Sequence, residues 1–162
     1  MKIVVNKLEY EVVCLLGKGK GGYSYLVSLD DKQYVVKQIH HEPCDYYQFG
    51  NKLESELRDY DTLKPLIRMP KLLDIDYENE RIVKEYICGD TIMDCVSKSC
   101  MKDVYFQQME DMCRVLYAHN LNIDYYPTNF VVQDDILYYI DYECNTYMEK
   151  WDFEHWGKQY WM

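Results

Sequence analysis

The sequence lacks the features that would mark a membrane-spanning, secreted or nucleic-acid-binding protein. No apolar run approaches the ~18 residues that a membrane-spanning helix needs. The first residues, MKIVVNKLEYEVV, have the pattern of a strand and not of a signal peptide. The formal net charge of −10 opposes binding to nucleic acid or to an anionic membrane. We therefore expect a cytoplasmic protein with no nucleic acid and no membrane among its partners.

The cysteines also lack a disulfide pattern. There are seven, an odd number, and no two of them form a CxxC pair. We interpret them as reduced thiols, most of them small core residues. At 162 residues, with no internal repeat and no low-complexity linker, the chain is long enough to bury a core without crosslinks.

Strand patterns dominate the first half of the chain. β-Branched and aromatic residues bounded by turn residues predict six strands, in KIVV, YEVVCLL, YSYLVSL, QYVVKQI and the two halves of KLLDIDYENERIVKEYI. A helix is predicted between the fourth and fifth strands, over about residues 46–66.

Helical patterns dominate the second half. A helical stretch is predicted over about 91–119, followed by a hairpin around Asp134-Asp135. The tail, which carries three tryptophans, is expected to form one or two short helices with most of the tryptophans in the core. The order predicts an α+β fold, with a β-rich lobe over 1–88 and a smaller helical lobe over 89–162.

A glycine-rich turn joins the second and third predicted strands. In LLGKGKGGYSYLV, Gly17, Gly19 and Gly22 have the spacing G-x-G-x-x-G. A strand follows the glycines, whereas a dinucleotide-binding fingerprint requires a helix there, so that interpretation fails. A hairpin whose backbone N–H groups cover nucleotide phosphates fits the pattern, and so does an ordinary glycine-rich turn.

A lysine and a glutamate are candidates to act with this turn. Val35, Lys37 and Ile39 share one face of their strand, so Lys37 could point at phosphates, although an edge lysine that reaches water has the same pattern. Glu56 lies inside the apolar stripe of the following helix, and Glu54 lies outside it. Because a buried carboxylate is costly unless it is paired, we expect Glu56, and not Glu54, to pair with Lys37.

The tripeptide Ile-Asp-Tyr occurs three times. Asp124 and Asn129 are five residues apart in IDYYPTN, and Asp141 follows the hairpin. Mg²⁺ prefers oxygen ligands, so Asn129 and Asp141, at the two ends of the hairpin, are candidate metal ligands. Asp124 is the candidate acceptor of a proton from an attacking hydroxyl, although the isolated pattern also fits a loop with Asx turns. Asp76 is expected to begin a turn and to do no chemistry.

Taken in order, these residues resemble the motifs of the protein-kinase-like superfamily. LGKGKGG is similar to its glycine loop, VVKQI to its phosphate-lysine strand, and ESELRDYDTL to its helix with the pairing glutamate. IDYYPTN is similar to its catalytic loop and IDYE to its metal-binding motif. VKEYICGD is similar to the hinge, which implies that backbone groups of Glu85 and Ile87 hold adenine. The resemblance covers about residues 10–145.

The resemblance implies a protein-kinase-like fold that binds ATP and Mg²⁺ in a cleft between a β-rich N-lobe and a truncated, mainly helical C-lobe with a β-hairpin. The implied roles are phosphate binding by Gly17, Gly19, Gly22 and Lys37, catalysis by Asp124, Lys37 and Glu56, and metal binding by Asn129 and Asp141.

At several positions the sequence differs from the usual kinase motifs, and these differences narrow the set of kinases that it resembles. Tyr126 stands where protein serine/threonine kinases usually have a lysine, which the RIO-type, KEOPS-complex and lipopolysaccharide-core kinases usually lack. Asn122-Ile123 replaces the usual His-Arg, and Glu143 is similar to an acidic residue of aminoglycoside and choline phosphotransferases. Only 21 residues (162 − 141) follow Asp141, so we expect a kinase reduced to its ATP site, whose core is covered by the aromatic tail.

The expected function is that of a minimal serine/threonine protein kinase, which transfers the γ-phosphate of ATP to a hydroxyl of a protein substrate. One alternative is an ATP-binding switch or ATPase subunit that acts with a partner protein, because helices that hold a peptide are missing. A second alternative is a small-molecule phosphotransferase, which Glu143 favours and the lack of a large substrate lobe opposes. A pseudokinase is disfavoured because Lys37, Asp124 and Asp141 are all present.

Overall fold

The computed structural model describes residues 1–19, 21–42 and 51–162. Within them the expected α+β class is confirmed, and the kinase-like fold stays a prediction. The chain forms two compact units. Unit 1 comprises residues 1–55 and 70–86, and unit 2 comprises residues 56–69 and 87–162. The division expected at 88/89 placed the first helix wholly with the strands, whereas in the structure that helix, α1 (Lys52–Leu63), contributes to both units.

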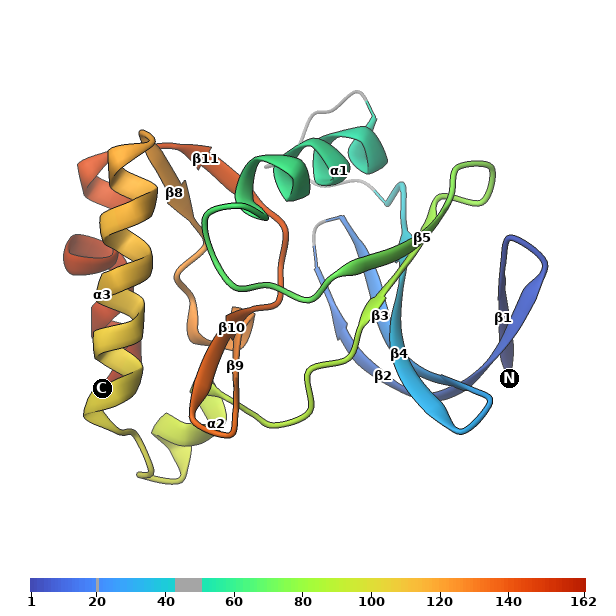
Figure 1. Cartoon of the computed structure of the whole chain (residues 1–162), viewed down its shortest axis with the longest axis horizontal. Helices are drawn as coiled ribbons and strands as arrows, with labels where there is room; N and C mark the ends of the chain where they lie inside the picture. Colours follow the sequence, from blue (N-terminus) through green and yellow to red (C-terminus); the bar gives the residue numbers. More distant parts are fainter. Residues whose placement is uncertain (20, 43–50) are drawn as a thin grey trace. The chain divides into compact units, whose positions relative to one another are not determined.

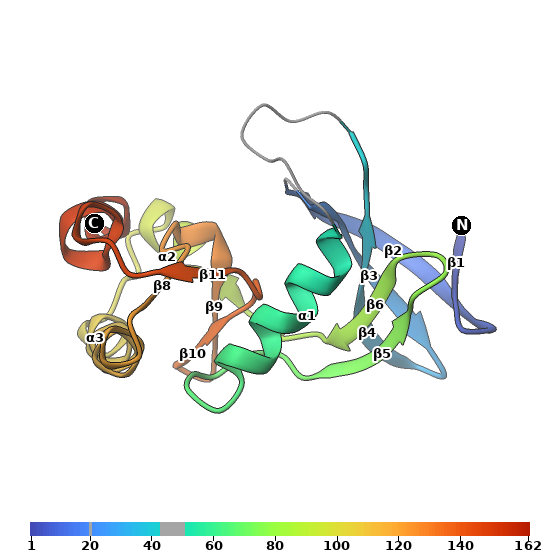
Figure 2. The same ribbon diagram turned by 90° about the horizontal axis from the view of Figure 1, so that it is seen from above.

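Unit 1 is built on a curled antiparallel sheet of six strands (Figures 1 and 2). The strands lie in the order β1-β2-β3-β4-β6-β5, and all six were predicted from the sequence. Their bounds are β1 Lys2–Val5, β2 Leu8–Lys18, β3 Gly22–Leu29, β4 Lys32–Ile39, β5 Leu72–Asp76 and β6 Arg81–Glu85.

Alternation along these strands sets the core of unit 1. Side chains of successive residues point to opposite faces of a sheet, so apolar residues at every second position gather on one face. One such face packs together Val5, Tyr10, Val27, Val36 and Val83, all of them buried. The period-two pattern in the sequence therefore corresponds directly to burial.

Unit 2 contains helices and three short strand pairings (Figure 1). The helices are α2 (Ile92–Ser97) and α3 (Asp103–Ala118), and short helical turns follow at η1 Pro127–Asn129, η2 Glu149–Trp151, η3 Phe153–Gly157 and η4 Lys158–Trp161. The strands are β7 Asp90–Thr91, β8 Leu121–Ile123, β9 Phe130–Gln133, β10 Ile136–Tyr139 and β11 Cys144–Thr146. The predicted hairpin β9–β10 is confirmed, with Asp134 and Asp135 in the left-handed conformation that its turn requires.

The helical stretch predicted over about 91–119 is confirmed, but it consists of two helices. The stretch divides into α2 and α3, and Ser99 between them has a φ of 56°, which no α-helix tolerates. The strands β7, β8 and β11 were not predicted, because two or three residues carry too little periodicity to be recognised. The predicted start of the first helix, at residues 46–50, lies outside the described residues.

The core of unit 2 joins α3 to the hairpin and the tail. Met109 and Leu116 of α3 are fully buried in one cluster with Leu137 of the hairpin and Phe153 and Trp161 of the tail. Of the three tail tryptophans, Trp161 is buried, Trp156 is half-buried against the core cluster and Trp151 is 49% exposed, so the expected core position is met for one of the three. No helix in the described part of the chain is long and apolar enough to cross a membrane.

The expectation that most cysteines are core residues is wrong for those that the structure describes. Cys95 and Cys113 are buried and Cys144 is half-buried, whereas Cys14, Cys88 and Cys100 are exposed. Cys44 lies outside the described residues.

Candidate functional site

The hairpin of unit 2 brings the two candidate metal ligands to one end of a strand pair. Phe130 is paired with Tyr139 at the open end of β9–β10. One residue further along each strand, the backbone N–H of Ile140 donates to the carbonyl of Asn129 at 2.9 Å. Asn129 and Asp141 therefore lie on adjacent backbone segments, as the sequence predicted for two ends of a hairpin.

A second strand pair holds the candidate catalytic loop beside the same end. β8 and β11 are antiparallel, with Ile123 paired to Cys144. Asp124 directly follows Ile123, and residues 140–143 directly precede Cys144. The loop 124–129 and the loop 140–143 thus run between the same two strand pairs and lie side by side.

A buried tyrosine links these two loops. The backbone N–H of Asp124 donates to the hydroxyl of Tyr139 at 3.2 Å, and that hydroxyl donates to the carbonyl of Glu143 at 2.7 Å. Tyr139 is fully buried. Burial, together with the charges of Asp141, Glu143 and Asp124, raises the pKa of Tyr139 well above its ordinary value. The phenol therefore stays neutral, and the negative charges of three nearby carboxylates favour that neutral form.

Internal hydrogen bonds shape the loop that carries Asp124. Its carboxylate accepts from the N–H of Tyr126 at 3.2 Å, which is an Asx turn, and its carbonyl accepts from the amide of Asn129 at 3.3 Å. The Asx turn that the sequence pattern also fits is therefore present, and the proton-accepting role of Asp124 stays a prediction. Asp141 likewise caps its own loop, accepting from the N–H of Tyr142 at 2.8 Å.

The oxygen atoms at this end of the hairpin fit Mg²⁺ better than a softer metal. Asn129 and Asp141 offer an amide and a carboxylate oxygen, the donor types that Mg²⁺ takes while it keeps several waters or phosphate oxygens. Within the described residues, the carboxylates of Asp124, Asp141 and Glu143 do not all come within 4.8 Å of one another. Binding of Mg²⁺ by Asn129 and Asp141 stays a prediction.

The glycine turn of unit 1 brings a lysine close to its backbone. Ser24 is paired with Lys37 across β3 and β4, and the backbone N–H of Gly19 donates to the carbonyl of Gly22 at 2.9 Å. A Cβ atom placed on Gly21 would lie 3.9 Å from the Nζ of Lys37. The Nζ of Lys37 therefore lies close to the glycine turn, and its action on phosphates stays a prediction. Lys20, within the turn, lies outside the described residues.

The three glycines of the G-x-G-x-x-G pattern differ in whether the surrounding structure requires glycine at their positions. A Cβ atom on Gly22 would approach the carbonyl oxygen of Gln38 to 2.4 Å, so strand packing alone demands glycine there. Gly17 and Gly19 would place a Cβ in open space, and no described glycine has a positive φ. Within the described chain, the fold itself does not explain glycine at Gly17 and Gly19.

The helix α1 has the phase that the sequence predicted. Glu56 is 9% exposed and Glu54 is exposed, so the buried glutamate is the one inside the apolar stripe. Leu53 and Leu63 of the same stripe are buried. The pairing of Glu56 with Lys37 stays a prediction.

The segment that resembles a kinase hinge begins at the end of β6. The carboxylate of Glu85 accepts from the N–H of Lys71 at 2.7 Å, and the N–H of Glu85 donates to the carbonyl of Lys71 at 3.0 Å. Both the side chain and the backbone N–H of Glu85 thus bond to Lys71. Adenine binding by Glu85 and Ile87 stays a prediction.

Asp76 is a structural residue. Its carboxylate accepts from the side-chain amide and the backbone N–H of Asn79, both at 3.0 Å, and from the N–H of Asn6 at 3.1 Å. These hydrogen bonds hold the pKa of Asp76 below its ordinary value. It is 4% exposed and joins the β1–β2 turn to the β5–β6 turn. Asp76 therefore begins a turn, as the sequence predicted.

Two features of this region were missed from the sequence. Tyr139 was taken only as a strand residue, and no local signal reveals that its hydroxyl joins two loops. Tyr126 packs its ring against Trp156 and Tyr160, with centroids 6.5 and 5.2 Å away, which places tail aromatics beside the Asp124 loop. The aromatic composition of the tail indicated packing but not its location.

Comparisons with known proteins add no relative to this description. Neither the known protein families nor the curated proteins give a match to the chain. The functional interpretation therefore depends on the residues and their geometry.

Proposed function

We propose that this protein is an ATP-dependent phosphotransferase, a minimal serine/threonine kinase that transfers the γ-phosphate of Mg-ATP to a hydroxyl. The supporting observation is the meeting of the loops 124–129 and 140–143 at the buried hydroxyl of Tyr139. This arrangement puts a candidate base and two candidate metal ligands at adjacent positions in one unit. Phosphoryl transfer depends mainly on such positioning and on stabilisation of charge.

The residues of unit 2 have distinct proposed roles. Asn129 and Asp141 would hold Mg²⁺, which neutralises phosphate charge when it is bound. The Asp124 carboxylate would accept the proton of the attacking hydroxyl, while its backbone is fixed by Tyr139 and Asn129. The Asx turn and the hydrogen bonds of the backbone hold Asp124 in place for this proposed role.

The residues of unit 1 would serve the same reaction by binding phosphate. The ammonium of Lys37 lies close to the glycine turn, and Gly17 and Gly19 occupy open positions that the described fold does not require to be glycine. Close approach of backbone N–H groups to phosphate oxygens supplies a reason for glycine at such positions. The buried carboxylate of Glu56 is the proposed partner that orients Lys37.

A partner-dependent ATPase is the second candidate. Trp156 and Tyr160 lie against Tyr126 of the catalytic loop, and Tyr160 is 38% exposed. Trp156 and Tyr126 are half-buried, and aromatic residues that cluster at the surface in this way are typical of protein interfaces. A protein that binds there would contact the Asp124 loop directly. Its side chains could then position the acceptor or the attacking water.

The proposal is tested by transfer of labelled γ-phosphate. The purified chain would be incubated with Mg²⁺ and ATP alone, with a generic acceptor protein and with a cell lysate, and both protein labelling and phosphate release would be measured. Lys37→Ala should lose activity, whereas Lys32→Ala, at the exposed start of the same strand, should keep it. Labelled protein supports the kinase, and release without labelling supports the ATPase. If wild-type protein neither binds nor turns over Mg-ATP, both proposals are wrong.

A further inference from the structure

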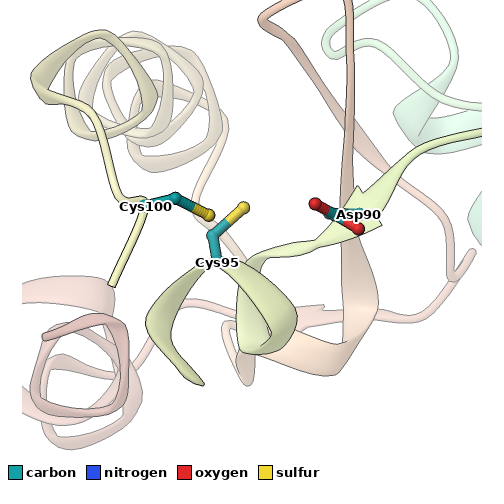
Figure 3. Close-up of side chains that lie close together, drawn as sticks. All are labelled: Asp90, Cys95 and Cys100. Atoms are coloured by element: carbon teal, nitrogen blue, oxygen red, sulfur yellow. The ribbon is translucent and has the colours of Figure 1, made fainter. Parts of the chain in front are cut away.

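Two thiols and a carboxylate meet around α2, and none of the three belongs to the residues of the proposed phosphotransfer site. The ligand atoms of Asp90, Cys95 and Cys100 all lie within 4.8 Å of one another. Figure 3 shows the two sulfur atoms turned toward each other, with the Asp90 carboxylate facing them from β7. We propose that these three side chains form a Zn²⁺ site, with water in the fourth position.

The backbone around this cluster is held by local hydrogen bonds. Thr91 and Asp94 form a capping box, in which the Thr91 hydroxyl accepts from the N–H of Asp94 at 3.0 Å and the Asp94 carboxylate accepts from the N–H of Thr91 at 3.0 Å. After the helix, the N–H of Cys100 donates to the carbonyl of Cys95 at 2.8 Å. The positive φ of Ser99 turns the chain back so that Cys100 returns toward Cys95.

The separation of the three ligand atoms is close to that of a tetrahedral zinc site. With Zn–S bonds of about 2.3 Å, two thiolates on a tetrahedral ion stand about 3.8 Å apart. A mutual distance of at most 4.8 Å therefore requires a shift of about 1 Å or less. Cys100 is exposed, so an ion and a fourth ligand from solvent can reach the site.

The chemistry of the donors selects against the metal of the proposed kinase reaction. Two thiolates are soft ligands that favour Zn²⁺, whereas Mg²⁺ binds to oxygen. Two thiolates and a carboxylate would give a Zn²⁺ complex one net negative charge. The ammonium of Lys98 lies 3.2 Å from an Asp90 oxygen and is placed to balance that charge, and the second carboxylate oxygen can face the metal.

The expected consequence of metal binding is a more stable unit 2. Cys95 belongs to the buried core cluster, and α2 packs against η1, η4 and β9. An ion bound only to the folded protein stabilises it by mass action. Zinc would therefore clamp β7, α2 and the following turn against the element that ends at Asn129.

The same two thiols could instead form a disulfide, and the role of Asp90 distinguishes the two chemistries. A disulfide requires an oxidant and uses only the sulfurs of Cys95 and Cys100. A zinc site forms under reducing conditions and loses affinity when the carboxylate is removed. Asp90→Asn is the informative variant because it keeps both thiols.

The test is zinc uptake by the metal-free protein under a phosphine reductant, measured by competition with a chromogenic chelator. Wild-type protein should take up one equivalent. Removing a residue that hydrogen-bonds to a metal ligand typically weakens metal affinity by about 10- to 100-fold. Cys100→Ser removes a ligand itself, so we expect it to weaken zinc binding by about 100-fold or more. Asp90→Asn should weaken it by at least about tenfold. Cys88→Ser, an exposed cysteine two residues from Asp90, should bind as wild type does.

Cobalt substitution gives a second readout that does not depend on the variants. Co²⁺ bound to the wild-type protein should show the thiolate-to-metal charge-transfer band of a sulfur-ligated tetrahedral site. No zinc uptake by wild-type protein, no such band, or equal affinities for Cys100→Ser and Cys88→Ser would each refute the site. Mg-ATP turnover is measured separately, so failure of the zinc site leaves the phosphotransferase proposal standing, and the reverse also holds.

Discussion

The hydroxyl of Tyr139 accepts a hydrogen bond from the backbone N–H of Asp124 at 3.2 Å, which ties the hairpin to the candidate catalytic loop. The same hydroxyl donates to the carbonyl of Glu143 at 2.7 Å. A single buried phenol therefore fixes the starting point of one loop and the end of the other. The proposed phosphotransfer site depends on this contact for its geometry, because neither loop is part of a long helix or strand.

Removal of that hydroxyl should destabilise the protein and slow its turnover. Tyr139→Phe removes two part-buried hydrogen bonds, one from the Asp124 N–H and one to the Glu143 carbonyl, at a cost of about 1–3 kcal/mol. We expect a lower urea midpoint with an unchanged slope, and reduced phosphate transfer. Tyr138→Phe is the control, because its half-buried ring and its contact with Arg68 are retained. Equal effects of the two substitutions would contradict the role given to Tyr139.

Asp124→Asn should distinguish the role of Asp124 in the Asx turn from its proposed role as a proton acceptor. Asparagine can still accept the hydrogen bond from the Tyr126 N–H, so the Asx turn survives while the base is lost. We expect turnover to fall by about 10²–10⁴-fold, with ATP affinity within about threefold of wild type. Asp124→Ala, which removes both functions, should lose at least as much. Wild-type turnover in Asp124→Asn would mean that Asp124 serves only the turn.

Asp141→Asn should weaken Mg-dependent ATP binding, whereas Asp76→Asn should not. A direct metal ligand should be worth at least about tenfold in affinity. Asp76 accepts hydrogen bonds from turn atoms of unit 1. Calorimetric titration of ATP with and without Mg²⁺ measures the difference. Similar losses in the two variants would show that the metal-binding role is assigned to the wrong aspartate.

Glu56→Gln should reduce turnover, and Glu54→Gln should be nearly silent. Glu56 is buried, and loss of its charge removes the proposed partner of Lys37. Glu54 is exposed, and surface charges contribute about 0–1 kcal/mol. Steady-state phosphate transfer by both variants at saturating ATP checks the assignment. A greater loss in Glu54→Gln would reverse it.

The stabilisation that Asp76 provides should depend on pH. Its folded-state pKa is held below the unfolded value of about 3.9, so the benefit is fully present above about pH 4 and is lost as pH falls through the lower folded value. Hydrogen bonds to a charged group are worth about 1.5–3 kcal/mol, so Asp76→Asn should cost about 2 kcal/mol at pH 7.

The matched control for this pH dependence is Asp134→Asn. Asp134 is an exposed turn residue with a positive φ that asparagine also adopts, so its substitution should be silent. Urea unfolding of the two variants and wild type between pH 7 and the acid limit gives the comparison. A cost of Asp76→Asn that stays constant down to low pH would contradict the ionic origin of the effect.

Burial could be predicted from the sequence where apolar residues recur with the period of a strand or a helix. Alternation located the six strands of unit 1, and the 3.6-residue stripe of α1 distinguished Glu56 from Glu54. Short-range turn chemistry located Asp76 and the Asp134-Asp135 hairpin. The α2–α3 break was missed because Ser99 is an ordinary residue in a helical pattern, and its positive φ comes from the return of the chain toward Cys95.

The sequence by itself determined which residues are inward-facing and the order of the motifs, because burial periodicity and turn preferences are local properties of the chain. Only the tertiary structure decided which distant atoms meet. The pairing of Ile123 with Cys144, the bridge from Tyr139 to Asp124, and the approach of Asp90 to two thiols each depend on long-range packing. Such contacts form because the packing of a whole unit brings the segments together. The two or three residues at each contact therefore have no local sequence pattern that would predict it.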